Sequence, residues 1–379
     1  MGLERGHRAR PLEWLAEKAI FVISLTAILM VFLIFLFITR EALPVLLGRA
    51  NSAVAREKPI PPEQMDTLKP ELLRSYLGLS SKEFSQMSRE TLRLLMEVKV
   101  EAAAEGGKDK DDTVNSTQWR YLFLPHQWSG YDRPEFIWQP VSRIHKYNIV
   151  PLIVGSLKTT FVALVFSVPL ALGAAIYVSQ LAPPRLKEWL KPAIELLAGI
   201  PSVVLGFFAL IVMASFFQGL FGYAYRLNAL VAGIALGLAC IPVVFSIAED
   251  SLTSVPRSYT EAALALGSSK WQAAWQIVLP AAMPGVFAAV VLGFGRAIGE
   301  TMVVLLASGN ASLLTWSLLD STRTITATIA AEMAEVTWGD HHYQMLFMLG
   351  ALLFVVAFAS NLLGDVIVHR LKHKLEGKR

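Results

Sequence analysis

Arg296 and Glu300 are the residues of this sequence best suited to chemistry, because both lie inside an apolar run from Pro284 to Ala307. A run of that length crosses a bilayer as one helix, and a lone Arg or Glu near the bilayer centre costs about 2.5–3.5 kcal/mol. The two charges are one helical turn apart, so a continuous helix lets them pair directly. Two interpretations stay open. Either the charges only neutralise each other, or Arg296 binds a tetrahedral oxyanion through its planar fork of donors while Glu300 holds the guanidinium between binding events.

Three further residues are candidates for the wall of such an anion pathway. Pro201 and Ser202 lie near the middle of another apolar run, Ala193–Phe217, and a proline inside a helix frees a backbone carbonyl, as in the broken helices of transporters. A structural kink explains them equally well. Thr301 adds a hydroxyl, although we expect that hydroxyl to bond to its own backbone. Lys158, near the outer end of Val150–Gln180, either attracts anions or extends its amine toward the membrane surface, and we favour the second.

Other kinds of site are not expected in this chain. The phosphate-binding loop G-x-x-x-x-G-K-[ST] occurs nowhere in the sequence, so the polypeptide is not expected to hydrolyse ATP itself. Its one cysteine, Cys240, excludes an internal disulfide. His341 and His342 beside Asp340 lack a third ligand at a suitable spacing, so we expect no metal site. No serine lies in a nucleophile-type glycine motif, which argues against an intramembrane enzyme. A nucleic-acid partner is not indicated, since Lys and Arg number 34 against 30 Asp and Glu.

The composition places these residues in membrane helices. The chain has 379 residues, of which 54% are hydrophobic and 17% charged, whereas soluble domains carry roughly 25% charged residues. We predict an all-α polytopic membrane protein with six transmembrane helices, because six apolar runs are each long enough to cross a bilayer: Ile20–Thr39, Val150–Gln180, Ala193–Phe217, Leu227–Ala248, Pro284–Ala307 and Tyr343–Val368.

The distribution of Lys and Arg predicts the orientation of these spans. With the N-terminus inside, the inner segments carry fourteen Lys and Arg and the two short outer loops only two, so the positive-inside rule places both termini in the cytoplasm. The predicted organisation is an N-terminal stretch with the first span (1–42), an extracytoplasmic insertion (43–149), a five-helix core (150–370) that contains an inner loop (250–283), and a basic cytoplasmic tail (371–379).

The insertion is predicted to be a separate, mostly helical region. Ser80-x-x-Glu83 is typical of a helix capping box, and apolar residues follow it at helical spacing from Phe84 to Val98. Seven aromatic residues gather between Trp119 and Trp138, just before the chain enters the next span. We expect these rings to anchor the chain at the membrane interface, and a ligand-binding platform is the less favoured alternative.

The inner loop carries a pattern of its own. Ser258-x-x-Glu261 predicts the capped start of a short helix, and Gly267 predicts its end, because glycine tolerates the left-handed turn after a helix. A second short helix, rich in tryptophan, is expected to stop at Pro280. The two helices would form a rigid knob whose apolar surface needs a partner or the membrane surface to cover it.

This loop resembles the EAA loop of bacterial ABC importer permeases, through residues at fixed separations: Glu261, Ala262, Ala263, Gly267, Ile277, Leu279 and Pro280. The resemblance implies that these residues form a coupling helix that docks onto an ATPase subunit. An amphipathic helix lying on lipid headgroups would account for the tryptophans, but it requires neither the Glu and Gly nor the Leu-Pro at these separations.

Two stretches narrow the resemblance further. Residues 195–206, ELLAGIPSVVLG, and residues 295–302, GRAIGETM, look like the phosphate-specific transport (Pst) permeases, and the Gly-Glu-Thr-Met form is closer to PstC-type than to PstA-type subunits. The resemblance covers residues 150–370. It implies an ABC permease fold in the bacterial inner membrane, with Arg296 and Glu300 important for transport. The long insertion departs from the shorter members of the family.

The same resemblance implies a substrate and partners. It points to a permease subunit of an ATP-driven, binding-protein-dependent importer of inorganic phosphate. Its partners would be a second, PstA-type permease, an ATPase dimer that holds ATP and Mg²⁺, and an outer phosphate-binding protein. No cofactor is expected in this chain. The alternative is an ABC permease for another oxyanion, namely sulfate, molybdate or phosphonate.

Overall fold

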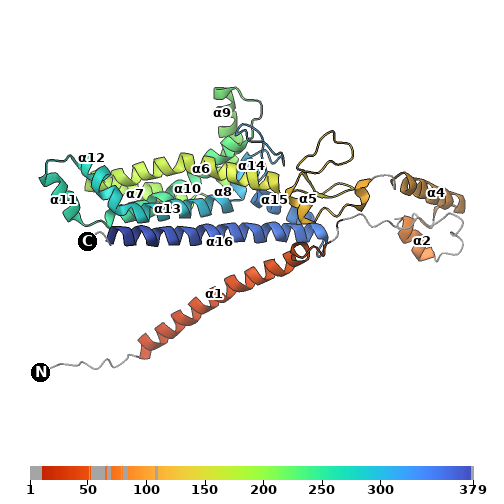
Figure 1. The fold of residues 1–379 in the computed structure, drawn as a ribbon, viewed down its shortest axis with the longest axis horizontal. Coiled ribbons are helices and arrows are strands. Elements are labelled where there is room, and N and C mark those ends of the chain that lie inside the picture. Colours follow the sequence, from red (N-terminus) through yellow and green to blue (C-terminus); the bar gives the residue numbers. More distant parts are fainter. Residues whose placement is uncertain are drawn as a thin grey trace. The chain divides into compact units, whose positions relative to one another are not determined.

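The computed structural model describes residues 11–50 and 110–376, and between them residues 52, 65, 70–77, 79, 84 and 86–106. The chain divides into two compact units. Met1–Ala50 and Ile149–Arg379 form one of them, called the membrane unit below, and Asn51–Asn148 form the other, called the insert unit. Figure 1 shows that the membrane unit is built of helices.

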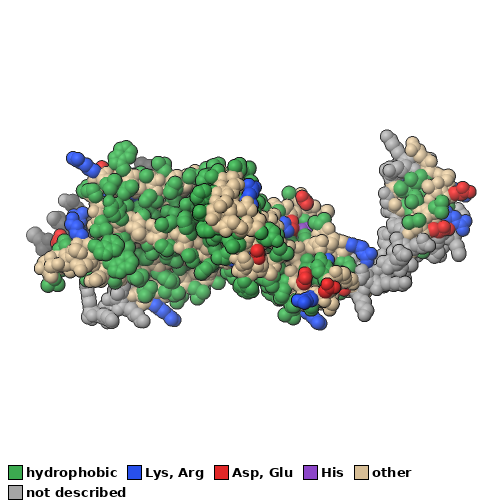
Figure 2. All heavy atoms as spheres, turned by 90° about the horizontal axis from the view of Figure 1, so that it is seen from above, with side chains coloured by type: hydrophobic (Ala, Val, Ile, Leu, Met, Phe, Trp, Pro, Cys, Tyr) green, Lys and Arg blue, Asp and Glu red, His purple; other side chains and the backbone are tan. Residues whose placement is uncertain are grey.

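Six helices of the membrane unit, counted over the described residues, are long and apolar enough to cross a membrane: Ala16–Leu46, Val150–Leu181, Ser202–Phe221, Ala229–Thr253, Lys270–Gly299 and His341–Leu371. The predicted number of spans is therefore confirmed. Figure 2 shows hydrophobic side chains over most of the visible face of this unit, as expected of a surface that meets lipid.

Three of the spans contain a π-turn, and three are regular helices. The regular ones are α1 (Pro11–Leu46), α10 (Ala229–Thr253) and α16 (His341–Glu376). The others are α6 (Val150–Ile176) with η3 (Tyr177–Leu181), then α8 (Ser202–Phe208) with η5 (Ala209–Met213) and α9 (Ala214–Phe221), and finally α12 (Lys270–Ala273) with η6 (Ala274–Val278) and α13 (Leu279–Gly299).

Small residues let α10 pack closely against two neighbouring helices. A Cβ atom at Gly233 of α10 would lie 2.5 Å from the Cβ of Val162 on α6. A Cβ atom at Gly293 of α13 would lie 2.6 Å from a methyl group of Val244 on α10. Close approach through small residues is a common way for membrane helices to associate. As a result α6, α10 and α13 form one packed group (Figure 1).

α1 and α16 pack as an antiparallel pair. The ring centroids of Phe35 and Phe354 are 4.9 Å apart, and those of Phe37 and Phe347 are 5.6 Å apart. Residue numbers therefore rise along one helix where they fall along the other. The N-terminal end of α1 and the C-terminal end of α16 thus lie toward the same side, as an even number of spans requires.

Shorter helices connect the spans and correct two predicted boundaries. α7 (Pro184–Leu196) and the 3-10 turn η4 (Leu197–Gly199) precede the third span, which begins at Ser202 and not at Ala193. The fifth span is Lys270–Gly299 and not Pro284–Ala307, because the chain leaves the helix at Glu300 and restarts as α14. The other connecting elements are α11 (Arg257–Ala265), α14 (Met302–Ala307), α15 (Ile325–Glu332) and η7 (Met333–Glu335).

An irregular segment, residues 308–324, follows α14 and is tied to α6. Lys158 of α6 donates through Nζ to the carbonyl oxygens of Thr315 and Ser317, at 3.1 and 2.9 Å. Its side chain is buried, so the prediction that it extends toward the membrane surface is wrong. The backbone carbonyls satisfy the ammonium inside the protein instead. Arg323 and Glu332 add an ion pair of 2.8 Å at the end of this segment.

The insert unit combines helices with a short sheet. Its elements are α2 (Pro70–Leu77), α4 (Arg89–Gly106), η2 (Lys110–Thr113), α5 (Trp119–Phe123), and the antiparallel strands β1 (Trp138–Gln139) and β2 (Lys146–Tyr147). Trp128 and Trp138 are buried within this unit, so the prediction of an interfacial anchor is wrong for these two rings. The predicted capping box at Ser80 and Glu83 lies outside the described residues.

Candidate functional site

A cavity of about 330 Å³ brings two of the predicted pathway residues together. Arg296, in the last turn of α13, and Ser202, at the start of α8, both line it. The remaining lining is mostly apolar and includes Leu205, Phe208 and Leu238. Arg296 is the one charged side chain among these described lining residues. A guanidinium facing an apolar cavity is an environment in which an anion interacts strongly.

The guanidinium of Arg296 is fixed by the backbone of a neighbouring helix. Its Nε donates to the carbonyl oxygen of Ala239 on α10, at 3.2 Å. No carboxylate pairs with Arg296 among the described residues, and the side chain as a whole is exposed in the isolated chain. The terminal guanidinium nitrogens are therefore available to a ligand.

Glu300 does not pair with Arg296, and the prediction that the two charges meet on one helix face is wrong. α13 ends at Gly299, and Glu300 has extended backbone angles, with φ −71° and ψ 138°. The helix break removes the one-turn geometry on which the predicted pair depends. The Glu300 carboxylate instead accepts hydrogen bonds from the backbone N–H groups of Thr301 and Met302, at 3.1 and 3.3 Å. It thereby satisfies free donors at the start of α14.

Thr301 and Pro201 also occupy helix junctions. The Thr301 hydroxyl donates to the Gly299 carbonyl at 3.5 Å, a local backbone contact of the kind expected for it. Pro201 is extended and immediately precedes α8, so it lies at the start of the third span and not in the middle of a helix as predicted. A proline fits the start of a helix because its missing N–H has no partner there anyway.

The inner-loop pattern folds into a helical hairpin made of α11, a tight turn and α12 (residues 257–273). Gly267 adopts φ +89° in the turn, as predicted for a residue that ends a helix. The predicted capping box at Ser258 is wrong, because α11 begins at Arg257 after Pro256 and Ser258 already lies inside the helix. The capping box is at Ser269, whose hydroxyl accepts from the N–H of Gln272 while the Gln272 side chain accepts from the N–H of Ser269.

Pro280 does not end the second helix. The chain runs from α12 through η6 into α13 without interruption, and Pro280 lies in the first turn of α13. Proline lacks an N–H and its ring crowds the carbonyl four residues earlier. The π-turn immediately before it changes the hydrogen-bond spacing at that point, which lets the helix continue.

The tip of the hairpin exposes apolar side chains. Leu266 is 89% exposed, Trp271 of α12 is 56% exposed, and Trp275, just beyond the hairpin in η6, is 53% exposed. The two indole rings stack with centroids 5.9 Å apart. Ala263 of α11 and Ala273 of α12 are buried. An exposed apolar cluster on a rigid element is typical of a docking surface.

The seven residues that carry the resemblance are spread over this hairpin and its connection to α13. Glu261 and Ala262 are exposed on α11, Ala263 is buried, and Gly267 forms the turn. The others lie in or next to η6, where Ile277 and Pro280 are exposed and Leu279 is partly buried.

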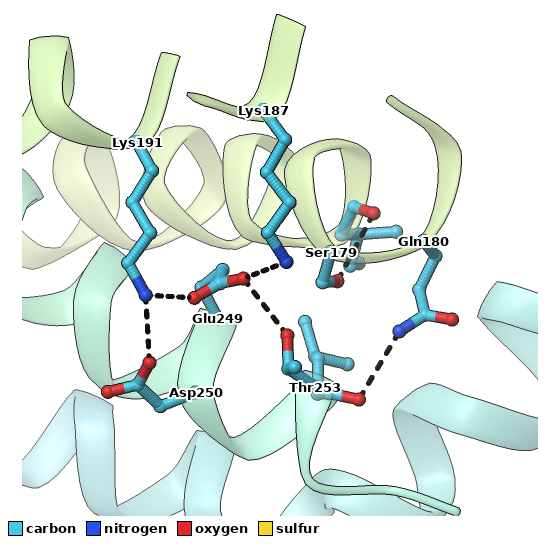
Figure 3. Close-up of polar contacts among 9 residues, drawn as sticks. Ser179, Gln180, Lys187, Lys191, Glu249, Asp250 and Thr253 are labelled. Atoms are coloured by element: carbon cyan, nitrogen blue, oxygen red, sulfur yellow. Dashed lines mark hydrogen bonds and ion pairs between the residues drawn. The ribbon is translucent and has the colours of Figure 1, made fainter. Parts of the chain in front are cut away.

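Sequence reasoning missed a buried carboxylate at the end of α10. Figure 3 shows Glu249 between two lysines of α7. Its carboxylate lies 2.8 Å from Lys187 Nζ and 2.6 Å from Lys191 Nζ, and it accepts a hydrogen bond of 2.9 Å from the Thr253 hydroxyl. Lys191 also pairs with the exposed Asp250 at 3.0 Å.

The contacts with Glu249 change the pKa of Lys191, and a pattern in the sequence could have predicted them. The pKa of Lys191, which lies outside the spans, is raised above its ordinary value, mainly because the ammonium donates a hydrogen bond to Glu249. The available signal was a carboxylate at the end of an apolar run together with Lys187 and Lys191 one turn apart on a nearby helix. From the sequence alone, those lysines contribute only to the prediction of how the spans are oriented in the membrane.

Comparisons with known proteins agree with this architecture. The sequence profile of the family described as "Binding-protein-dependent transport system inner membrane component" matches residues 167–373. A Bacillus subtilis protein named "Probable ABC transporter permease protein YqgH" is 36% identical over 62% of this chain and 76% of its own length. The "Phosphate transport system permease protein PstC" of Xylella fastidiosa is 35% identical over 62% of this chain and 78% of its own length.

A solved structure of the MetNI methionine ABC transporter aligns with a TM-score of 0.46 at 18% identity, over 58% of this chain and 96% of that chain. The profile match alone covers more than half of the sequence. On the strength of that match and of the relatives above 30% identity, the chain belongs to the family of inner membrane components of binding-protein-dependent transport systems.

Proposed function

We propose that this chain is a permease subunit of an ATP-driven, binding-protein-dependent importer of inorganic phosphate, and that it supplies half of the translocation pathway. The observation that carries this proposal is the Arg296 guanidinium on an apolar cavity, bound to a backbone carbonyl and to no described carboxylate. Relatives named as PstC phosphate permeases support the choice of substrate.

The chemistry of Arg296 suits an oxyanion. Its planar fork of donors matches two oxygens of a tetrahedral phosphate, and it stays charged at any physiological pH. The mostly apolar lining lowers the polarity around the guanidinium, which strengthens its attraction for an anion. Ser202 lines the same cavity and offers a hydroxyl that can donate to a phosphate oxygen. Glu300 and Thr301 shape the helix junction next to this arginine.

A partner must supply the energy. The exposed hairpin tip supports docking onto a separate ATPase dimer that holds ATP and Mg²⁺, since the chain itself contains no phosphate-binding loop. A second, PstA-type permease would complete the pathway, and an outer phosphate-binding protein would deliver the substrate. The excess of Lys and Arg on one side supports an orientation with both termini and the hairpin in the cytoplasm.

Transport follows from two states of different affinity. ATP binding closes the ATPase dimer, the docked hairpins move together, and the two permeases open outward to receive phosphate. Hydrolysis restores the inward-open state. Net transport requires that phosphate and ATP each bind the two states differently.

The test of substrate is uptake by the reconstituted complex. Proteoliposomes that contain this chain with its second permease and ATPase are supplied with the phosphate-binding protein and radioactive phosphate. We expect ATP-dependent phosphate uptake that excess sulfate, molybdate and phosphonate do not inhibit. Uptake of one of those anions in preference to phosphate would replace the substrate while leaving the transporter class unchanged.

The test of the ATPase partner is Glu261→Lys, which reverses a charge on the exposed face of α11. We expect this variant to assemble in the membrane but to lose co-purification with the ATPase. Glu335→Lys, a charge reversal at another exposed position, in η7, is the control and is expected to keep the ATPase bound. Equal co-purification of both variants would argue against docking through α11.

A further inference from the structure

Glu249 is a buried charge that the anion cavity does not use. Its side chain is 1% exposed, whereas those of its partners Lys187 and Lys191 are 34% and 31% exposed. A buried carboxylate is tolerated only when it is paired and hydrogen-bonded, and loss of its partners leaves a charge without compensation. Because both lysines come from α7, these ion pairs hold α7 against the end of α10 (Figure 3).

The same turn of α10 is the stem of the α11–α12 hairpin. Thr253, which donates to Glu249, is the last residue of α10, and α11 begins four residues later at Arg257. A second polar contact reaches this turn from η3, where the Gln180 side chain donates to the Leu252 carbonyl at 3.2 Å. Two independent contacts therefore fix the point at which α10 leads into the hairpin.

α10 also reaches the cavity. The carbonyl that binds Arg296 belongs to Ala239, which lies on the same helix as Glu249 and roughly 15 Å from it along the axis. α13, which carries Arg296, packs on α10 near the hairpin as well, since a Cβ at Gly285 would lie 2.1 Å from the Ser251 hydroxyl. α10 therefore connects the hairpin stem to the cavity.

We infer that Glu249 is a positioning residue that locks the hairpin stem to α7, so that movement of the hairpin shifts α10 as a rigid element and does not bend the stem. Lys187, Lys191 and Thr253 act through this carboxylate. The inference rests on the proposed function, because it requires an ATPase that moves the hairpin.

The charge of Glu249, and not only its shape, is needed for this role. Glutamine has nearly the same size, but its side chain offers one acceptor oxygen and a pair of donors. It cannot accept from two ammonium groups and a hydroxyl together. Glu249→Gln therefore removes the lock while it preserves the packing of α10.

The test measures transport and hydrolysis on the same proteoliposomes containing the complete transporter. For Glu249→Gln we expect ATP hydrolysis within about twofold of wild type and phosphate imported per ATP reduced about tenfold, within the usual range of coupling between sites. The matched control is Glu188→Gln. Glu188 is exposed on α7, and the described residues show no ion pair to it. This control is expected to keep the wild-type ratio.

A wild-type ratio in Glu249→Gln overturns the inference. If that variant does not assemble, Lys187→Gln and Lys191→Gln decide the question, because each removes one of the two ion pairs to Glu249 and leaves the other in place. We expect the ratio to fall about two- to fivefold in each. Wild-type ratios in both would overturn the inference equally.

If phosphate is not the substrate, wild-type vesicles hydrolyse ATP without importing phosphate. That result is distinguishable from an incorrect role for Glu249. The inference is decided in that case by spin labels attached at Leu230→Cys, a partly buried position at the end of α10 remote from the hairpin, and at Phe207→Cys, an exposed position on α8. ATP is expected to change the distance between the labels in the otherwise wild-type protein and to leave it nearly unchanged when Glu249→Gln is added. An equal change in both proteins would refute the role of Glu249.

Discussion

At the scale of single residues, the bonding of Arg296 bears on the anion-binding role that we propose for it. Its Nε is committed to the Ala239 carbonyl, which orients the guanidinium without neutralising it. A carboxylate partner would have lowered the attraction for an anion. The separation of Arg296 from Glu300 therefore favours the anion-binding interpretation over a purely structural ion pair.

Replacing Arg296 by lysine tests this reading, because the charge is kept while the fork of donors is lost. A hydrogen bond to a charged group contributes about 1.5–3 kcal/mol, so we expect the phosphate concentration for half-maximal uptake to rise about 10- to 100-fold. Arg226→Lys, on an exposed loop, serves as the control. An unchanged concentration dependence would remove Arg296 from the substrate pathway.

A double-mutant cycle tests the separation of the two charges. Arg296→Ala, Glu300→Ala and the double variant are compared by thermal unfolding of the purified protein. Loss of the cap on α14 is expected to cost about 1 kcal/mol in Glu300→Ala, and the two effects should add to within about 0.5 kcal/mol. A coupling well above that value would indicate a direct ion pair.

The sequence predicted which residues carry charge in the membrane but not how they bond. Spacing by one turn implies a pair only on an unbroken helix, and α13 ends at Gly299. The backbone carbonyl of Glu300 accepts a hydrogen bond from the hydroxyl of Thr326 on α15, a contact between residues far apart in the sequence that spacing does not reveal. Glu249 was missed for a related reason, since its partners come from a separate helix.

At the scale of elements, the hairpin shows that a capping-box pattern in the sequence does not always form a capping box in the structure. Two stretches match the capping-box pattern, one at Ser258 and one at Ser269, and only the second forms it. Pro256 decides the outcome at the first, because its fixed φ starts α11 before Ser258. Gly267 was predicted correctly because its conformation depends on the turn alone.

Gly267→Ala is expected to weaken docking of the ATPase. A side chain at φ +89° is strained, at a cost of about 1–2 kcal/mol, so the turn should relax and change the angle between α11 and α12. The measurement is the affinity of the ATPase for the detergent-solubilised permease. Gly219→Ala, a position without positive φ and with open space around it, should leave that affinity unchanged, and equal affinities for the two variants would contradict the prediction.

The contact between α7 and α10 is expected to resist alkaline pH. Folding raises the pKa of Lys191, so its contribution to stability is fully present below the ordinary value of 10.5 and is lost only as the pH rises through the raised value. The difference in melting temperature between wild type and Lys191→Gln should therefore stay constant from about pH 7 to pH 10 and shrink above that. A difference that disappears near neutral pH would contradict this assignment.

At the scale of the whole molecule, the lengths of the apolar runs predicted the number of spans correctly but misplaced the boundaries of the third and fifth. The third and fifth runs contain residues that belong to connecting helices, because an apolar run does not distinguish a span from an amphipathic helix that continues it. The interior of the insert unit was also beyond prediction, since the spacing of Trp128 and Trp138 does not reveal that they pack inside it.

Replacing residues 51–148 by a flexible linker should leave the membrane unit intact. The insert unit has buried residues of its own, including Leu73, Met96 and Trp138. We therefore expect membrane insertion and co-purification with the ATPase to persist, with loss of association with the phosphate-binding protein. Degradation of the shortened chain in the membrane would show that the two units depend on each other for folding.

The π-turn η6 sets the rotational phase between the hairpin and Arg296. Each such turn holds one residue more than regular α-helix needs, and one residue corresponds to about 100° of rotation about the helix axis. Deleting a single residue from Ala274–Val278 would regularise the helix and turn the tryptophan face of the hairpin by that angle relative to the cavity. The direction in which the hairpin faces relative to Arg296 therefore depends on the one extra residue in η6.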